Sequence, residues 1–167
     1  ASRPICLASI AEYAAVAALA VACAATGGTA AAESELAPIA IVDNGIPVPL
    51  TATPGDPVAG RLTLRDTSRA TCLICHEMPI PEDRDHGNIG PSLAGVGSRY
   101  SAAELRLRIV NPKVINPETI MPAYYWVEGL NRVDVPYQGT TIYTAQQVED
   151  AVAYLLTLTD EAEGHRP

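Results

Sequence analysis

The 167-residue sequence contains no phenylalanine and a single tryptophan, Trp126, although 48% of its residues are hydrophobic. Large aromatic side chains normally supply much of the buried area of a core, so this chain has little material for a core of its own. A bound apolar group would fill that deficit. The sequence also lacks a run of about 20 uninterrupted apolar residues, so we expect no membrane span.

Basic residues are scarce as well, since 11 lysines and arginines stand against 19 acidic residues and give a net charge of -8. Proteins that bind nucleic acid neutralise its phosphates with basic residues, so the charge argues against a nucleic-acid partner. An acidic chain instead favours a protein partner with a basic docking face.

Two of the four cysteines belong to the motif Cys72-Leu73-Ile74-Cys75-His76, which is the signature of covalent haem c attachment. Two thiols at this spacing can add to the two vinyl groups along one edge of a porphyrin. The histidine that follows is held beneath the iron, so His76 is predicted to be the proximal axial ligand.

Two other functions of such a motif fit the sequence less well. A redox dithiol of the thioredoxin type would be followed by a helix, whereas Pro79 and Pro81 interrupt the chain here. A zinc site would need a second Cys/His pair at finger-like spacing, and Cys6 and Cys23 lie far upstream. We therefore predict one covalent haem c. Because bacteria attach haem c outside the cytoplasm, we expect an exported protein.

The chain divides into an N-terminal extension (1–54), a haem domain (55–160) and a polar tail (161–167). The extension is predicted to begin with a retained, Ala-rich helical segment. A signal peptide is the alternative, although Glu12 and Tyr13 interrupt its apolar run. Prolines punctuate the rest of the extension and predict an extended connector with at most one edge strand.

A disulfide between Cys6 and Cys23 is the second expectation for the extension, because an exported protein can keep such a bond. One straight helix would separate these residues by about 25 Å, whereas the Cα atoms of a disulfide lie about 4.4–6.8 Å apart. The bond and a single helix therefore exclude each other, and the disulfide predicts a helical hairpin.

Three helical segments predict an all-α haem domain. Asp56 and Pro57 form the N-cap and first turn of a helix that runs toward Thr67. Capping boxes at Ser101 and Thr144 start two more, and the last carries an apolar stripe at helical spacing. A helix followed directly by the haem motif resembles class I cytochromes c. That resemblance implies their fold, with the terminal helix packed against the first.

Met121 is predicted to be the sixth ligand of the iron. Met78 is only two residues from His76 and is tied to the proximal side, whereas Met121 lies far enough downstream to reach the opposite face. His86, in an acidic loop expected to be solvated, and His165, in the polar tail, are the alternatives and would give a bis-histidine iron. A buried core methionine without metal contact is the remaining case.

Two further segments have candidate roles at the haem. Gly90-Pro91-Ser92-Leu93 resembles a Gly-Pro-x-Leu piece of class I cytochromes c, in which the proline carbonyl accepts the second ring proton of the proximal histidine. The resemblance implies that Pro91 orients His76, and a plain surface turn is the alternative. Tyr124-Tyr125-Trp126 can either pack the haem edge or form a docking surface.

Several pieces of the haem domain resemble the SoxX family, the small monohaem subunit of SoxAX complexes. The resemblance covers about residues 55–160 and rests on Gly87-Asn88-Ile89-Gly90-Pro91, Gly95-Val96-Gly97-Ser98-Arg99-Tyr100, Met121-Pro122-Ala123-Tyr124-Tyr125, Glu128-Gly129-Leu130-Asn131-Arg132-Val133 and Thr144-Ala145-Gln146-Gln147-Val148-Glu149-Asp150. It implies a periplasmic heterodimer with a larger SoxA-like cytochrome subunit, on which the catalytic cysteine is expected.

The resemblance also implies a reaction. Such a complex joins thiosulfate oxidatively to a cysteine of a carrier protein, and the SoxX subunit passes the electrons to a soluble cytochrome c. Because Cys72 and Cys75 are used by the haem, we expect no thiosulfate-transferring activity from this chain alone. A free-standing periplasmic electron shuttle is the alternative function, and a haem-based ligand sensor with Met121 displaced is a third.

Overall fold

The computed structural model describes residues 36–160, which lie within the second of two compact units, Leu36–Pro167. The expected Cys6–Cys23 disulfide, the Ala-rich helical segment and the polar tail lie outside the described residues. Within those residues the fold is all-α, as predicted, with four α-helices and three short 3₁₀ turns. The edge strand considered for the connector is absent there, since the only β-type pairing is a single bridge between Val42 and Gly45. No described helix is long and apolar enough to cross a membrane.

Helix α1 (Pro57–Arg65) begins where its N-cap signal predicts. The Asp56 carboxylate accepts a hydrogen bond from the Val58 amide at 2.8 Å, and proline occupies the first helical position. The helix ends two residues before the expected Thr67, because Asp66 adopts an extended backbone conformation.

Both predicted capping boxes are present. Ser101 opens α3 (Ala102–Val110) and Thr144 opens α4 (Ala145–Thr157), and in each case the side chain at the third helical position bonds back to the cap residue. The short helix α2 (Val96–Arg99) was not predicted. It follows Gly95, whose φ of 64° is a left-handed conformation that glycine adopts without strain.

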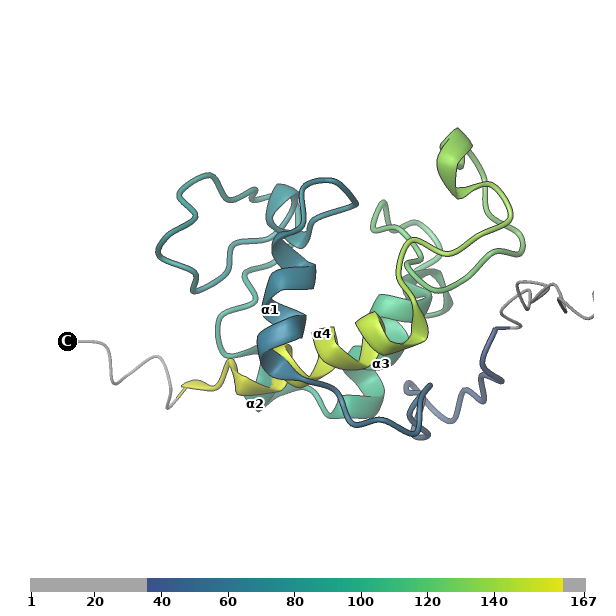
Figure 1. The fold of residues 1–167 in the computed structure, drawn as a ribbon, viewed down its shortest axis with the longest axis horizontal. Coiled ribbons are helices and arrows are strands. Elements are labelled where there is room, and N and C mark those ends of the chain that lie inside the picture. The colour runs from purple at the N-terminus through teal and green to yellow at the C-terminus, as the bar shows by residue number, and fades with distance from the viewer. Residues whose placement is uncertain (1–35, 161–167) are drawn as a thin grey trace, which may run out of the picture. The chain divides into compact units, whose positions relative to one another are not determined.

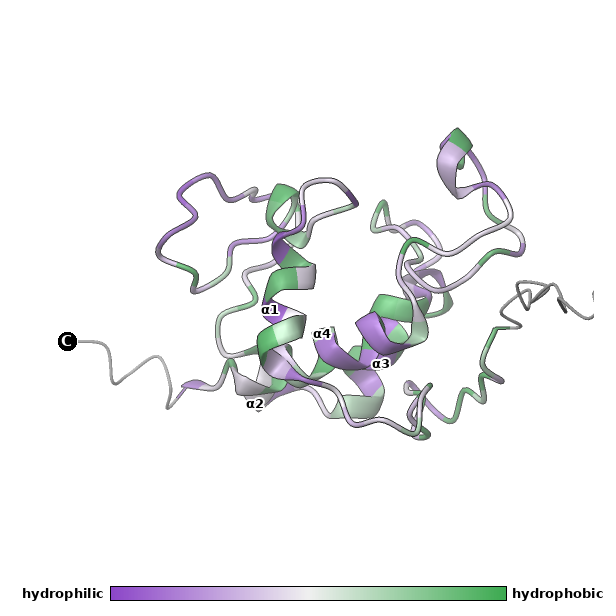
Figure 2. Cartoon of the chain, in the orientation of Figure 1, coloured by the Kyte–Doolittle hydropathy of each residue, from purple (hydrophilic) through white to green (hydrophobic). Residues whose placement is uncertain are grey.

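Helix α1 packs against α4 at very close range (Figure 1). A Cβ atom at Gly60 would lie 1.9 Å from the Asp150 carbonyl oxygen, so only glycine allows this approach. Helix α3 packs on α4 as well. Figure 2 shows that α3 and α4 each combine hydrophobic and hydrophilic residues, as expected of helices that bury one face.

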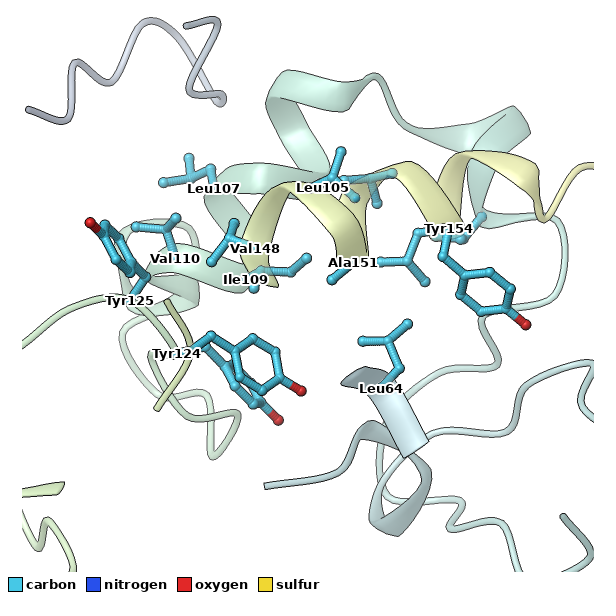
Figure 3. Close-up of a cluster of buried hydrophobic side chains, with 14 of the residues drawn as sticks. Leu64, Leu105, Leu107, Ile109, Val110, Tyr124, Tyr125, Val148, Ala151 and Tyr154 are labelled. Carbon is cyan, nitrogen blue, oxygen red and sulfur yellow. The ribbon is translucent and has the colours of Figure 1, made fainter. Parts of the chain in front are cut away.

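The core lies between these helices and beneath the loops that join them. In Figure 3, Leu105 and Ile109 of α3 meet Val148 and Ala151 of α4, and Leu64 of α1 faces them. All five are buried.

A buried ion pair joins α3 to α4. Arg106 Nε and Glu149 Oε1 lie 2.7 Å apart, and the two side chains are only 5% and 6% exposed. Arg106 Nη1 also donates to the Ile46 carbonyl, and Glu149 Oε1 accepts from the Leu50 amide. Ile46 and Leu50 are themselves core residues. The end of the connector is therefore fixed to the helices through a closed set of charged hydrogen bonds.

Candidate haem site

The haem motif forms a tight turn that gathers its three reactive side chains. Residues Cys72–Ile74 form a 3₁₀ turn (η1), and the His76 amide bonds to the Cys72 carbonyl at 2.9 Å. Thr71 holds the start of this turn, since its hydroxyl donates to the Leu64 carbonyl at the end of α1. Cys72 and Cys75 form no disulfide with each other. The first helix thus positions the attachment residues directly.

The imidazole of His76 is oriented by the glycine–proline segment. Its Nδ1 lies 2.7 Å from the Pro91 carbonyl oxygen. Because a carbonyl can only accept, this contact requires a proton on Nδ1 and leaves the lone pair of Nε2 for a metal. A Cβ atom at Gly90 would lie 2.3 Å from Cε1 of His76, so the absence of a side chain there makes room for the ring.

A cavity of about 370 Å³ opens in front of this imidazole. His76 lies on its wall, Met121 contributes another part of the wall, and Cys72 and Pro91 line it as well. A smaller cavity of about 190 Å³ shares these four residues and adds Cys75. The two thiols, the imidazole and the thioether of Met121 therefore border one space, although they come from separate loops.

The loop that carries Met121 is held at both ends. On one side, Lys113 Nζ donates to the Thr119 carbonyl at 2.7 Å, and the Thr119 hydroxyl accepts from the Met121 amide. On the other, the Tyr124 amide bonds to the Ile109 carbonyl at the end of α3. These bonds fix Met121 at the cavity.

The side chains around the cavity fit a haem. Its apolar walls can cover the macrocycle, and they include Leu64, Leu93, Val96, Leu105, Ile109 and Leu155. Two cations, Arg99 and Arg108, also line it and would pair with the carboxylates of the macrocycle. The chain would hold the haem covalently through Cys72 and Cys75, with His76 and Met121 as the predicted axial ligands. The apolar volume also accounts for the shortage of large aromatics in the sequence.

His86 does not border either of these cavities. Its Nδ1 accepts a hydrogen bond from the Met78 amide at 3.2 Å, and its Nε2 is buried without a partner among the described residues. The acidic loop around it is largely exposed, as expected, and His86 itself is half-buried. The ring lies beside a separate cavity of about 460 Å³, whose lining includes neither cysteine of the haem motif nor Met121. Met78 is 3% exposed and belongs to the core, and His165 lies outside the described residues.

The three aromatic residues after Met121 have three different environments. Tyr124 lines both cavities, the hydroxyl of Tyr125 accepts a hydrogen bond from the Ala37 amide, and Trp126 packs partly buried against the core. The run therefore does not act as one surface.

Tyr143, a residue that the sequence did not single out, also lines the larger cavity. Its ring packs against that of Tyr124 with centroids 4.6 Å apart. Burial raises the pKa of the Cys72 thiol to about 11, and burial also raises the pKa of Tyr124 and of Tyr143 well above the usual phenol range. Both phenols therefore stay protonated. In the sequence, Tyr143 is notable only because it directly precedes the cap residue Thr144. That position does not indicate a function.

Comparison with known proteins agrees with this site. The family model for cytochrome c matches residues 66–159. No curated protein sequence matches the chain. A chain of the crystal structure of SoxXA from P. pantotrophus is similar, with 33% sequence identity and a TM-score of 0.67 over 73% of this chain and 95% of that chain. The chain belongs to the cytochrome c family, with covalent haem c, and within that family to the SoxX group.

Proposed function

We propose that this chain is the electron-transfer subunit of a periplasmic complex of the SoxAX type. The complex would join thiosulfate oxidatively to a cysteine of a carrier protein, with a larger SoxA-like subunit supplying the catalytic cysteine. The electrons would leave through this chain to a soluble cytochrome c. When bound, haem c supplies one-electron chemistry, and the residues of this chain anchor, orient and shield it.

The similarity to a chain of SoxXA carries this proposal, since it extends over 95% of that chain. The site agrees with a relay function. Within residues 36–160 the only cysteines are Cys72 and Cys75, and both are needed for thioether bonds. No thiol in that part of the chain is left to accept thiosulfate, so the bond-forming step is assigned to the partner.

The rim of the smaller cavity supports contact with a partner. Ile89 and Ile120 line this cavity together with both motif cysteines, yet they are 65% and 76% exposed. Ile74, between the two cysteines, is 63% exposed. We call these three residues the isoleucine rim. Apolar residues exposed around a redox centre favour a protein interface that excludes water and shortens the path for electrons.

The test is to co-express the chain with the larger haem subunit from the same organism. We expect the two to copurify in a one-to-one complex. In the presence of a carrier thiol and thiosulfate, the complex should reduce cytochrome c, whereas the haem-loaded chain alone should not. Haem staining of the fraction released by osmotic shock tests the proposed periplasmic location.

A free-standing electron shuttle is the alternative. It is favoured if the chain from its native source elutes as a monomer and never copurifies with a larger cytochrome. Conjugation of thiosulfate to a thiol by the isolated chain would contradict the assignment of the bond-forming step to the partner.

A further inference from the structure

Arg99, the last residue of the short helix α2, contacts the segment that orients the proximal histidine. Its Nη2 donates a hydrogen bond to the Ser92 carbonyl at 3.1 Å, and its Nη1 donates to the Ala94 carbonyl. Ser92 directly follows Pro91, whose carbonyl oxygen lies 2.7 Å from Nδ1 of His76. One planar guanidinium group therefore holds two carbonyls close to the one that fixes the ring.

The peptide group between Ser92 and Leu93 is held at both ends. Its carbonyl accepts from Arg99, and its N–H, which belongs to Leu93, donates to the Glu77 carbonyl at 2.9 Å. Because a peptide group is planar, these two bonds fix its orientation. The proline ring fixes the φ angle of Pro91. Little freedom is then left for the peptide group between them, which carries the carbonyl that faces the imidazole.

Helix α2 gives Arg99 a rigid base, because it packs against the C-terminal end of α4 (Figure 1). The Gly97 amide bonds to the Leu158 carbonyl at 2.8 Å. A Cβ atom at Gly97 would lie 2.5 Å from the Leu156 carbonyl oxygen, so the two helices approach closely. Val96 is 3% exposed and belongs to the core. The bonds from Arg99 thus connect the packed helices to the loop beside the proximal ligand.

Arg108 lines the same cavity but has different contacts. Its Nη1 donates to the Glu104 carbonyl on its own helix at 3.0 Å, and its guanidinium carbon lies 3.9 Å from the centre of the Tyr100 ring. Neither contact involves residues 90–94. Arg108 therefore shares its charge and the cavity with Arg99 but not the two bonds to the proximal segment.

We propose that Arg99 is a positioning residue for the proximal ligand. By holding two neighbouring carbonyls, it keeps the Pro91 carbonyl on Nδ1 of His76. A guanidinium group has five N–H donors, and these carbonyls use two of them, so the others stay available to a carboxylate of the macrocycle. The proposal requires the attached haem but does not depend on the thiosulfate function.

The test is proton exchange of the His76 ring, followed by NMR in the reduced, haem-loaded full chain. The Nδ1 proton exchanges with water when its bond to the Pro91 carbonyl opens. In Arg99→Met, which keeps an unbranched side chain but removes every donor, we expect this exchange to be about tenfold faster. Arg108→Met is the matched control, because it removes the same charge from the same cavity. Exchange in that variant should equal exchange in the unmodified chain.

Backbone amides separate positioning from a general loss of stability. The Leu93 amide belongs to the clamped peptide group and should also exchange faster in Arg99→Met. The Tyr124 amide bonds to the Ile109 carbonyl at 3.0 Å and joins a different loop to α3, so its exchange should stay unchanged. Equal acceleration at both amides would mean that the whole fold has loosened, and it would overturn the proposal.

Arg99→Lys separates the charge from the fork geometry. A lysine ammonium carries the same charge but lacks the planar fork that bonds to two carbonyls at once. Exchange at His76 should therefore be faster than in the unmodified chain and slower than in Arg99→Met. Full restoration by lysine, an unchanged rate in Arg99→Met, or an equal increase in Arg108→Met would each overturn the proposal.

Because the readout is a ring proton, this test is independent of thiosulfate. A chain that forms no complex with a larger subunit can still show the expected exchange rates. A complex that is active with thiosulfate can equally lack them.

Discussion

At the scale of single residues, the cavity brings together groups with different tasks. His76 and Met121 both line the cavity, and as the predicted axial ligands they would offer the iron one nitrogen and one sulfur. Such a ligand pair would give a higher potential than harder ligands do. The Pro91 carbonyl acts on His76 by fixing the position of its ring proton. Each of these residues can be tested without altering the helices, because each lies in a loop.

The role of Met121 is tested by Met121→Ala. We expect the weak absorption band at the red end of the visible spectrum, which marks a methionine–iron bond, to disappear in the oxidised protein. The potential should fall, and the reduced protein should bind carbon monoxide at neutral pH, because the sixth position is then open. Met78→Leu is the control, since Met78 is buried in the core and should leave the band intact. A band that persists in Met121→Ala would show that another group is the ligand.

The space beside His76 is tested by Gly90→Ala. The added methyl would collide with the imidazole at 2.3 Å, so the ring must move away from the Pro91 carbonyl. We expect a loss of about 1–3 kcal/mol in the free energy of unfolding and a changed haem spectrum. Gly129→Ala adds the same methyl where no atom lies within 4 Å, although at a φ of 64°. It should cost only about 1–2 kcal/mol of backbone strain and leave the spectrum unchanged. A normal spectrum in Gly90→Ala would contradict the tight fit.

At the scale of secondary-structure elements, stability depends on how α3 and α4 are joined. The Arg106–Glu149 pair is almost fully buried and also holds Ile46 and Leu50. Charged groups of this kind are costly to bury, so the pair is stable only while every partner is present.

Glu149→Ala would leave the Arg106 cation buried without its partner. We expect a loss of about 3–5 kcal/mol in the free energy of unfolding, measured by urea denaturation of the haem-loaded chain. Arg69→Ala removes an exposed ion pair with Asp66 and should cost no more than about 1 kcal/mol. Equal losses in the two variants would mean that the buried pair does not join the helices in solution.

The capping box of α3 predicts a dependence on pH. Hydrogen bonds from the backbone amide and the hydroxyl of Ser101 lower the pKa of Glu104. Since the pKa is lower in the folded state, this carboxylate stabilises the fold above its unfolded pKa, and the contribution is lost as the pH falls through the folded value. Between about pH 5 and pH 3, the urea midpoint should therefore fall less in Glu104→Gln than in the unmodified chain. If the urea midpoint falls equally in both proteins as the pH is lowered, this role of Glu104 is contradicted.

At the scale of the whole molecule, the chain is an acidic cytochrome with a small apolar surface around its redox centre. The isoleucine rim lies at the smaller cavity, which is lined by both motif cysteines. A partner that covers this rim would bring its own redox group close to the haem edge.

Ile120→Lys tests this surface. Placing a charge in the middle of an apolar contact should weaken binding to the larger subunit by about tenfold, as measured by calorimetry or surface plasmon resonance. The potential of the isolated chain should hardly change. Val58→Lys is the matched control, because Val58 is 69% exposed on α1 and lines neither cavity of the haem site. Equal affinities of the two variants would remove the rim from the interface.

The sequence by itself determined the features that depend on neighbouring residues. The haem motif requires only the order Cys72, Cys75, His76, and the starts of α1, α3 and α4 follow from cap residues one to three positions away. The end of a helix depends more on residues that are distant in the sequence. Helix α1 ends two residues earlier than predicted because the loop leading to Thr71 turns back onto Leu64.

Only the tertiary structure decided which distant residues share a site. Tyr143 and Arg108 carry no motif, yet the packing of loops and helices places both at the cavity. Arg106 and Glu149 are charged residues of the kind usually found on the exposed face of a helix. They are buried together only because α3 packs on α4. Such contacts depend on how helices pack across long stretches of chain, whereas caps and attachment motifs are set by backbone geometry within one turn. Local geometry therefore fixed where the haem is attached, and long-range packing fixed what surrounds it.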